Sequence, residues 1–298
     1  MTRERSTPGF IRLYRLGRLL LHLVYGCYCV GVVFPFYSWP RRFVAIKRWS
    51  RGILRIVRLR LTVRGSLPKD VVPTLIVSNH VSWLDMWVIN SVVPVRFVSK
   101  ADVRRWPVLG FLVTRAGTIF IERTKRHDTA RTNRNMVQAL LRHEHVAIFP
   151  EGTTTDGTEV KPFHASLFQP VLGAGARVVV LALRYVNSNG STNLDASYAG
   201  ERSLWQSVQL ILSHRSLRAE LTFAGTIDAS GKTRREIARE AEGITAAALR
   251  LSPPNRKTGT ADGPRGAERT AFAPTDTLYP IRSHSAPAPG QALTSDRR

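Results

Sequence analysis

A histidine and an aspartate with four residues between them are the first pair in this chain whose types suit acid–base chemistry. His80 and Asp85 lie between an apolar run at 74–77, typical of a buried strand, and one at 86–89, typical of a helix start. On a regular helix, five steps of about 100° would separate the two side chains widely, so they meet only across a turn. Across such a turn, Asp85 can hold one ring nitrogen of His80 while the other takes a proton from a substrate hydroxyl.

The position of this pair at the end of a predicted strand favours a functional site. Open α/β sheets bind their ligands at the carboxyl ends of the strands, and an imidazole, with an ordinary pKa of about 6.5, serves as a base near neutrality. Polar neighbours at Ser78, Asn79 and Ser82 point the same way. The alternative is that His80 caps the helix or packs in the core while Asp85 lies at the surface, and this stretch alone leaves it open.

Two further stretches place polar groups directly after predicted strands. Gly117–Arg123 ends in a charged pair, and Arg123 can bind an anionic head group or simply be solvated. Residues 149–157 run from an apolar strand into Glu151, Gly152 and a row of threonines. Glu151 can accept hydrogen bonds from a substrate hydroxyl or from neighbouring backbone, and a plain glycine-rich turn is the alternative reading.

The composition narrows the class of partner. The chain of 298 residues has a formal net charge of +23 at pH 7, which predicts an anionic partner, either nucleic acid or an acidic membrane surface. A hydrophobic content of 43% is ordinary for a globular protein with a core. The only cysteines, Cys27 and Cys29, lie in an apolar stretch and provide neither a disulfide framework nor a metal-ligand spacing, so we expect no metal.

Residues 1–60 predict a membrane anchor followed by a basic amphipathic helix. The 22 residues Leu19–Pro40 contain no Lys, Arg, Asp or Glu, and a helix of that length is about 33 Å long, against roughly 30 Å for a bilayer core. Prolines and glycines within it favour an embedded or re-entrant anchor over a full span. Over 41–60, basic and apolar side chains fall on opposite arcs, as in an interfacial membrane helix or in a helix packed on the domain core.

Residues 61–251 predict an α/β domain, with a mixed, mostly parallel sheet layered by helices and preceded by the N-terminal membrane-associated helices. The last helix is predicted to begin at Thr233, which has a capping-box spacing with Glu236. Residues 252–298 are rich in proline and predict a disordered tail. The strand candidates are 74–77, 95–99, 118–121, 146–149, 178–183 and 219–223, and the earlier helix candidates are 81–92, 101–114, 128–142 and 163–172.

Taken together, these stretches resemble the glycerolipid acyltransferases, the family that includes 1-acylglycerol-3-phosphate acyltransferase. The resemblance covers roughly Leu61 to Leu183. The family motifs Asn-His-x4-Asp, Gly-x-x-Phe-Ile-x-Arg and Phe-Pro-Glu-Gly-Thr match, in order and spacing, Asn79, His80, Asp85, Gly117, Phe120, Ile121, Arg123 and 149–153.

The resemblance implies direct transfer of a fatty acyl chain from acyl-CoA or acyl carrier protein to a lipid hydroxyl, with no other cofactor. It implies His80 as the general base and Asp85 as its orienting partner. It further implies membrane lipids as partners and a place at the inner membrane, facing the cytoplasm. The residues implied to bind substrate are Asn79, Gly117, Phe120, Arg123, Glu151, Gly152, Thr153 and Thr154.

Two departures from the family pattern concern the acceptor. Phosphate-acceptor members usually have Arg after Glu-Gly-Thr, where this chain has Thr154, and the usual Val-Pro-rich fourth motif is here 177–183. These features look more like members that acylate lyso-ornithine lipid, and lysophosphatidic acid stays open. Two other classes compete: a basic nucleic-acid-binding protein, although no helix-turn-helix or zinc-finger pattern is present, and a non-catalytic lipid-binding adaptor, which would not need His80 and Asp85.

Overall fold

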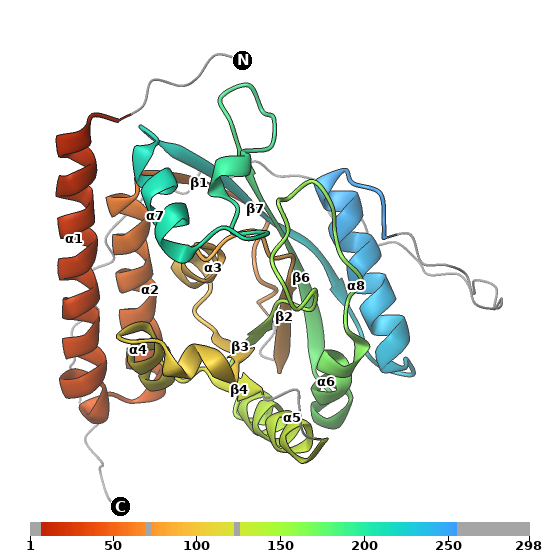
Figure 1. Ribbon diagram of the computed structural model, residues 1–298. Helices are drawn as coiled ribbons and strands as arrows, with labels where there is room; N and C mark the ends of the chain where they lie inside the picture. Colours follow the sequence, from red (N-terminus) through yellow and green to blue (C-terminus); the bar gives the residue numbers. More distant parts are fainter. Residues whose placement is uncertain (1–6, 70–72, 122–125, 255–298) are drawn as a thin grey trace, which may run out of the picture.

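The sheet at the centre of the molecule is built from strands that are far apart in the sequence (Figure 1). The computed structural model describes residues 7–69, 73–121 and 126–254, so most of the predicted tail lies outside the described residues. Neighbouring strands are parallel except for the antiparallel pair β6–β7, which confirms the predicted mixed, mostly parallel sheet. In sheet order, the strands of the described residues are β1 (Leu59–Arg64), β7 (Leu217–Ile227), β6 (Arg177–Val186), β2 (Thr74–Ser78), β5 (Val146–Ile148), β3 (Arg96–Lys100) and β4 (Ile119–Ile121).

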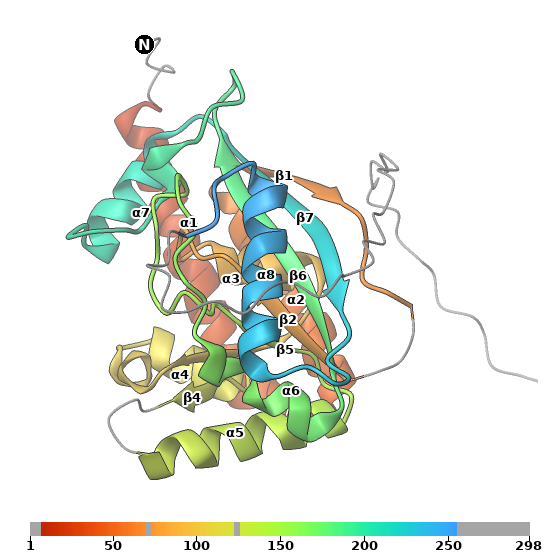
Figure 2. The ribbon, with the colours of Figure 1, turned by 90° about the vertical axis from the view of Figure 1, so that its right-hand side faces the viewer.

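Helices cover both faces of the sheet, as Figures 1 and 2 show from two directions. One face carries α1, α2, α3 and α7, and the other carries α5, α6 and α8. The α-helices of the described residues are α1 (Gly9–Tyr28), α2 (Trp39–Ile56), α3 (Asp85–Val92), α4 (Leu109–Arg115), α5 (Arg126–Leu141), α6 (Gln169–Ala174), α7 (Leu204–Ser213) and α8 (Arg234–Leu249).

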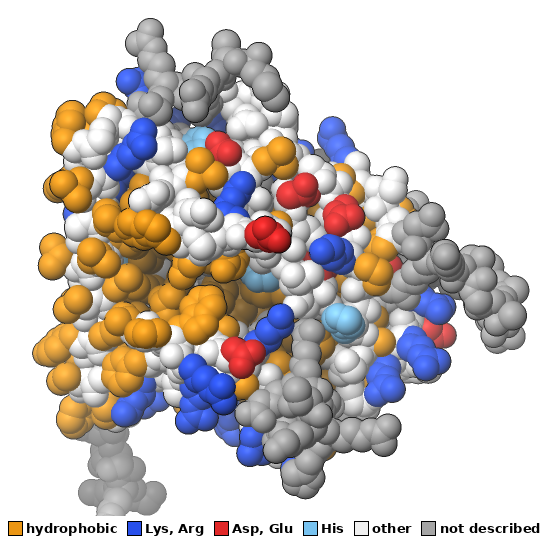
Figure 3. Space-filling view, in the orientation of Figure 1, with side chains coloured by type: hydrophobic (Ala, Val, Ile, Leu, Met, Phe, Trp, Pro, Cys, Tyr) orange, Lys and Arg blue, Asp and Glu red, His pale blue; other side chains and the backbone are white. Residues whose placement is uncertain are grey.

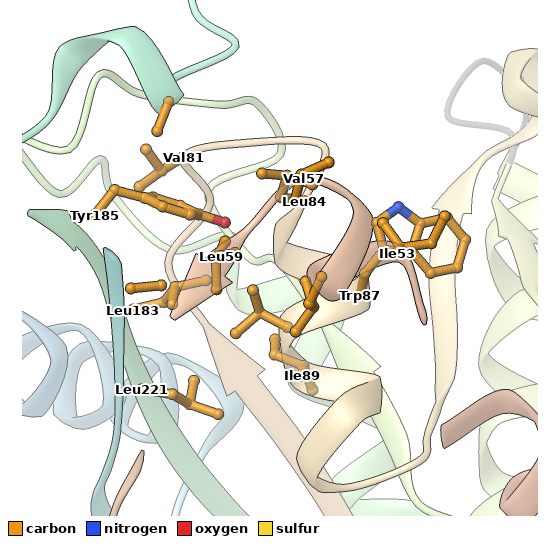
Figure 4. Close-up of a cluster of buried hydrophobic side chains, with 14 of the residues drawn as sticks. Ile53, Val57, Leu59, Val81, Leu84, Trp87, Ile89, Leu183, Tyr185 and Leu221 are labelled. Carbon is orange, nitrogen blue, oxygen red and sulfur yellow. The ribbon is translucent and has the colours of Figure 1, made fainter. Parts of the chain in front are cut away.

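The apolar run at 74–77 forms β2, a strand whose side chains are buried in a separate hydrophobic core on each face of the sheet. Leu75 and Val77 point into the cluster under α5, α6 and α8, whereas Ile76 points into the cluster under α1, α2 and α3. Alternate residues of a strand face opposite sides, so a strand covered on both faces needs apolar residues throughout. Figure 4 shows part of the second of these cores, with Val81 beside the β6 residue Tyr185 and Leu84 next to Val57.

The N-terminal helices α1 and α2 lie side by side and antiparallel (Figure 1). His22 stacks on Trp49 with ring centroids 4.9 Å apart, and its Nε2 donates to the Trp49 carbonyl at 2.9 Å. Trp49 Nε1 donates back to the His22 carbonyl at 3.0 Å. A Cβ on Gly26 would meet Trp49 Nε1 at 2.7 Å, so the absence of a side chain there allows the two helices to pack this closely.

The two predicted N-terminal segments pack differently on the domain. The apolar face of α2 faces the core, with Ile53, Leu54 and Val57 buried and Arg51 and Arg55 exposed, which favours core packing over an interfacial position for that face. By contrast, α1 leaves many large apolar side chains uncovered. Its exposed large hydrophobic residues are Phe10, Leu13, Tyr14, Leu20, Leu21, Val24, Tyr25 and Tyr28.

Several elements differ from the sequence prediction: β1 was not predicted, and the helix predicted over 163–172 is divided into a 3₁₀ turn at Ala165–Phe168 and α6. The helix predicted over 41–60 ends at Ile56, because β1 begins at Leu59 and pairs with β7. The helix predicted over 101–114 is divided into a 3₁₀ turn at Ala101–Arg105 and α4. The helix α7 was not predicted. The start of α8 is confirmed, since Thr233 and Glu236 form the reciprocal capping box.

Candidate active site

The turn between β2 and α3 brings His80 and Asp85 together. His80 Nδ1 lies 2.8 Å from Asp85 Oδ2, so the predicted meeting across a turn is confirmed. The same carboxylate oxygen accepts the backbone N–H groups of Val81 at 2.7 Å and Ser82 at 2.9 Å. Asp85 is the first residue of α3, where the helix dipole favours a negative charge.

The second oxygen of Asp85 has a partner that sequence reasoning missed. Tyr185, on β6, donates its hydroxyl to Asp85 Oδ1 at 2.7 Å. Burial and the neighbouring Asp85 charge raise the pKa of Tyr185 well above its usual value, so the phenol keeps its proton and remains a donor. Both residues are buried, and both carboxylate oxygens are therefore fixed.

The orientation of the His80 ring is fixed on its face as well as at its edge. The Asp85 oxygen accepts, so Nδ1 of the His80 ring carries a proton and donates it. Phe149 stacks on the imidazole with ring centroids 4.0 Å apart and planes 9° apart. The His80 side chain is 22% exposed, whereas the Asp85 side chain is fully buried.

Asn79 connects the turn that carries His80 and Asp85 to the sheet. Its amide nitrogen donates to the Leu183 carbonyl and its amide oxygen accepts the Leu183 N–H, both at 2.8 Å. The side chain is buried, and these two bonds hold the end of β2 to β6. Because Tyr185 lies on β6 together with Leu183, the two Asn79 bonds also fix the position of the turn relative to Tyr185.

Glu151 braces the backbone of the turn. Its Oε1 accepts the His80 N–H at 2.8 Å and its Oε2 accepts the Lys161 N–H at 3.0 Å, so of the two predicted roles the structure shows the contact with neighbouring backbone. Burial raises the pKa of Glu151 to about 7, and the two backbone N–H groups oppose this rise. Thr155 N–H also donates to the His80 carbonyl at 2.8 Å, which joins the loop to the turn a second time.

The other predicted residues of this loop have different surroundings. Gly152 has a positive φ of 71°, which suits glycine, and Thr153 is exposed. Thr154 donates its hydroxyl to the Tyr198 carbonyl. Tyr198 N–H in turn donates to the Val81 carbonyl at 2.7 Å, so Thr154 helps to support the far side of the turn between β2 and α3.

The second motif lies at the edge of the sheet. Gly117 has φ +88°, and a Cβ there would meet the Trp39 ring at 2.5 Å, while Arg96 donates to its carbonyl at 2.7 Å. Phe120 is half-buried in the edge strand β4, and Arg123 lies outside the described residues. The described contacts of Gly117 are therefore with α2, with β3 and, through its N–H to the Thr114 carbonyl at 3.1 Å, with α4, and none of them joins it to His80.

An apolar cavity of about 720 Å³ opens between α1, α2, α3, α4 and β3. Its wall includes Phe97, which stacks on Phe149 at 5.5 Å, and Phe149 stacks on His80. The ring of Phe149 therefore lies between the Phe97 wall of the cavity and the His80 imidazole. Figure 3 shows hydrophobic side chains extending from the α1 side of the molecule to the hollow at its centre. Among the residues that the structure describes, no cluster of His, Cys, Asp and Glu is suited to a metal ion.

Comparisons with known proteins agree with this architecture. The sequence profile of the family described as Acyltransferase matches residues 60–184. The chain is 36% identical over 189 residues to the 1-acyl-sn-glycerol-3-phosphate acyltransferase of Neisseria meningitidis serogroup B, covering 62% of this chain and 72% of the relative. It is 32% identical over 210 residues to the lyso-ornithine lipid O-acyltransferase of Pseudomonas aeruginosa, covering 70% and 80%.

The fold is also similar to a solved structure. The crystal structure of the 1-acyl-sn-glycerophosphate acyltransferase PlsC from Thermotoga maritima matches with a TM-score of 0.63 at 18% identity, covering 81% of this chain and 94% of the other. The shared fold and the sequence similarities define an acyltransferase. More particularly, the chain belongs to the acyltransferase family that its motifs resemble, and its relatives carry the names of enzymes for two lysolipid acceptors.

Proposed function

We propose that this acyltransferase is membrane-associated and moves a fatty acyl chain from a thioester, acyl-CoA or acyl carrier protein, to the free hydroxyl of a lysolipid. The observation that carries the mechanism is the His80–Asp85 pair at 2.8 Å at the carboxyl end of a central strand. Asp85 fixes the proton on Nδ1, and Nε2 then acts as the general base.

The proposed reaction needs one base that returns its proton. His80 Nε2 removes the proton of the acceptor hydroxyl as the oxygen attacks the thioester carbonyl carbon. The tetrahedral intermediate collapses, the new C–O ester bond remains, the C–S bond breaks, and the thiolate takes the proton back from His80. General base catalysis of this kind contributes on the order of 10²- to 10⁴-fold in rate. Asp85 stabilises the transient imidazolium.

Two surfaces support a lipid substrate and a membrane setting. The apolar cavity next to the stack of Phe97, Phe149 and His80 suits an acyl chain. The segment 9–36 is long and apolar enough to cross a membrane by length and composition, and much of its surface is exposed. We place the protein at the inner membrane with its active site facing the cytoplasm.

Of the two substrates, the acceptor lipid is the one whose identity fewer of the described residues bear on. Phosphate-acceptor relatives usually have Arg at the position of Thr154. A threonine has no charge to offer a phosphate, and the Thr154 hydroxyl already donates to the Tyr198 carbonyl. Thr153 is exposed beside it and can contact a head group. We propose lyso-ornithine lipid as the acceptor, with 1-acylglycerol-3-phosphate as the second candidate because of the similarity to the Neisseria enzyme.

A two-acceptor assay tests this proposal. Purified protein in detergent is given a labelled long-chain acyl-CoA or acyl carrier protein and, in parallel, lyso-ornithine lipid or lysophosphatidic acid. We expect transfer to lyso-ornithine lipid, and we expect His80→Ala to lose about 10²- to 10⁴-fold of the rate. His143→Asn, at an exposed histidine just after α5, controls for the loss of an imidazole elsewhere. Transfer only to lysophosphatidic acid would reverse the choice of acceptor, and full activity of His80→Ala would refute the base.

A further inference from the structure

A second exposed apolar surface lies on α4 and on the 3₁₀ turn Ala101–Arg105 that precedes it. We call residues 101–115 the α4 tip. Three of its large apolar side chains are exposed, Trp106 by 39%, Val108 by 50% and Phe111 by 43%. Single apolar side chains at a surface need no explanation, whereas three within six residues form a patch that suits a binding partner.

The backbone of the α4 tip is closed by its own contacts. A Cβ on Gly110 would overlap the Arg104 carbonyl, so the 3₁₀ turn packs directly onto the first turn of α4. Gly110 N–H donates to the Trp106 carbonyl at 2.9 Å, and Trp106 N–H donates to the Val103 carbonyl at 3.1 Å. The exposed side chains are therefore presented by a hydrogen-bonded backbone.

Val108 has a backbone conformation that is unfavourable for its residue type. Its φ of +64° and ψ of −60° form a γ-turn, in which Leu109 N–H donates to the Pro107 carbonyl at 2.6 Å. Among the described non-glycine residues with a positive φ, Val108 is the only β-branched one. Glycine would relieve this strain, so a half-exposed valine here indicates a use for an apolar side chain.

The α4 tip continues the exposed apolar surface of the N-terminal segment. A Cβ on Gly31 would meet the Phe111 ring at 3.4 Å, so Phe111 lies against the segment 9–36, which is long and apolar enough to cross a membrane. Figure 1 shows α4 near the C-terminal end of α1. Leu112 and Val113, on another side of α4, line the apolar cavity. The helix therefore separates this cavity from the exposed apolar surface.

Arginines flank the apolar side chains of the α4 tip. The Arg115 guanidinium lies 5.6 Å from the centroid of the Phe111 ring, so its stem runs along apolar surface. Tryptophan beside arginine is typical of segments at a bilayer–water interface, where the indole lies at head-group level and the guanidinium reaches phosphates. The charged residues of the tip are Asp102, Arg104, Arg105 and Arg115, all of them exposed.

We propose that the α4 tip is a second membrane contact, in which Trp106, Val108 and Phe111 enter the bilayer interface beside α1 and the arginines bind lipid phosphates. This inference rests on the membrane association in the proposed function and is independent of which lysolipid accepts the acyl chain. With α4 in the interface, only this helix stands between the bilayer and the apolar cavity, so a lipid passes from one to the other without crossing water.

Vesicle sedimentation tests the contact. Trp106→Ser with Phe111→Ser should weaken binding to phosphatidylcholine vesicles that contain phosphatidylglycerol, by about 10-fold for each side chain that no longer inserts. Leu141→Ser with Leu172→Ser is the control pair, at side chains 52% and 38% exposed on α5 and α6, and should bind like wild type. Equal binding of the tip variant and wild type overturns the proposal and leaves the α1 anchor in place. No binding of wild type overturns both.

Val108→Gly separates membrane contact from folding. Glycine adopts a positive φ without strain, so the unfolding midpoint in detergent should equal or exceed that of wild type. Vesicle binding should nevertheless weaken about 10-fold, because the apolar side chain is lost. A variant that binds vesicles as tightly as wild type would remove Val108 from the contact.

Tryptophan fluorescence distinguishes a bilayer from a protein partner. The emission of Trp106, taken as the difference between wild type and Trp106→Phe on vesicles, should be quenched by brominated lipid. A difference that brominated lipid leaves unquenched overturns the proposal. Unchanged vesicle binding of Trp106→Ser with Phe111→Ser, together with a raised KM for acyl carrier protein, overturns it in favour of a docking site for that protein.

Discussion

The carboxylate of Asp85 accepts hydrogen bonds from four groups of the protein: the His80 ring, the N–H groups of Val81 and Ser82, and the Tyr185 hydroxyl. A fully buried carboxylate is costly unless such donors replace its water. Three of the four donors come from the turn itself, and the fourth comes from β6. Tyr185 is therefore the group that fixes the carboxylate relative to the sheet.

Replacing Tyr185 with Phe tests this positioning role. The change leaves Asp85 Oδ1 buried without a donor, which we expect to lower the free energy of unfolding by about 1–3 kcal/mol. A carboxylate held by one donor fewer also orients His80 less firmly, so we expect kcat/KM to fall. Both quantities are measured against Tyr14→Phe, an exposed tyrosine on α1.

A double variant separates positioning from simple destabilisation. If Tyr185 acts through Asp85 on His80, Tyr185→Phe should cost no further activity in a His80→Ala background. An unchanged kcat/KM in the single variant, or an additive loss of rate in the double variant, would mean that Tyr185 only fills space.

Glu151 gives a pH dependence of stability whose sign follows from its pKa. An unfolded Glu titrates near its ordinary value of 4.5, and burial raises the value in the folded protein to about 7. Between these values the folded state binds more protons, so this group makes stability fall as pH rises from 4.5 to 7, by up to about 3 kcal/mol. Glu151→Gln should remove that slope.

Denaturant titrations between pH 4.5 and 8 measure the effect. Glu151→Gln loses one of the two backbone acceptors, so it should be less stable than wild type near pH 5 by about 1–2 kcal/mol, and the two curves should converge towards pH 7. Parallel curves for wild type and Glu151→Gln would show that Glu151 titrates normally.

At the scale of elements, the sequence predicts the strands that are buried on both faces and misses β1, which has one buried face. Continuous apolar runs identify β2, β5 and β6. In β1, residues 59–64 show the alternation of a strand with one buried face, but they overlap the end of a helical pattern. Residues 59–64 form a strand because they pair with β7, beginning with Leu59 opposite Leu217. No local sequence pattern encodes that long-range pairing.

In the candidate site, too, local patterns predict local contacts and miss long-range ones. The spacing of His80 and Asp85 predicts their meeting because the contact is local. Tyr185 lies 100 residues from Asp85 in the sequence, and its only local signal is a hydroxyl within an aliphatic strand. The direction of Glu151, towards backbone and not towards a ligand, likewise depends on the fold of the whole loop.

The exposed apolar side chains of α1 give a testable prediction about membrane association. Leu21 and Val24 are 71% and 66% exposed on its outer side. Burying each in a bilayer is worth about 1.5–3 kcal/mol, so Leu21→Asp with Val24→Asp should reduce vesicle binding on the order of 10²-fold or more. Sedimentation with lipid vesicles measures this, and activity in detergent should be retained.

A control pair replaces apolar side chains that are exposed on other elements. Leu172→Asp with Leu194→Asp introduces the same charges away from α1, at side chains 38% and 50% exposed. Vesicle binding should remain near wild type. If both pairs weaken binding equally, the added negative charge is responsible, and α1 is not the membrane-contacting element.

Over the whole molecule, the apolar surface and the net charge act together. Figure 3 shows hydrophobic side chains concentrated on the α1 side, with Lys and Arg side chains along the lower rim of the central hollow. The chain carries a net charge of +23. Apolar insertion does not depend on the charge of the lipid, whereas attraction to anionic lipid is worth about 1 kcal/mol for each Lys or Arg near the surface and is screened by salt.

Salt therefore separates the two contributions. Raising NaCl from about 0.05 to 0.5 M shortens the screening length several-fold, so binding to anionic vesicles should weaken strongly while binding to neutral vesicles changes little. The Leu21→Asp, Val24→Asp variant should lose binding to neutral vesicles and keep a salt-sensitive part on anionic ones. Equal salt dependence on both kinds of vesicle would mean that the charge serves the anionic donor and contributes nothing to holding the protein at the membrane.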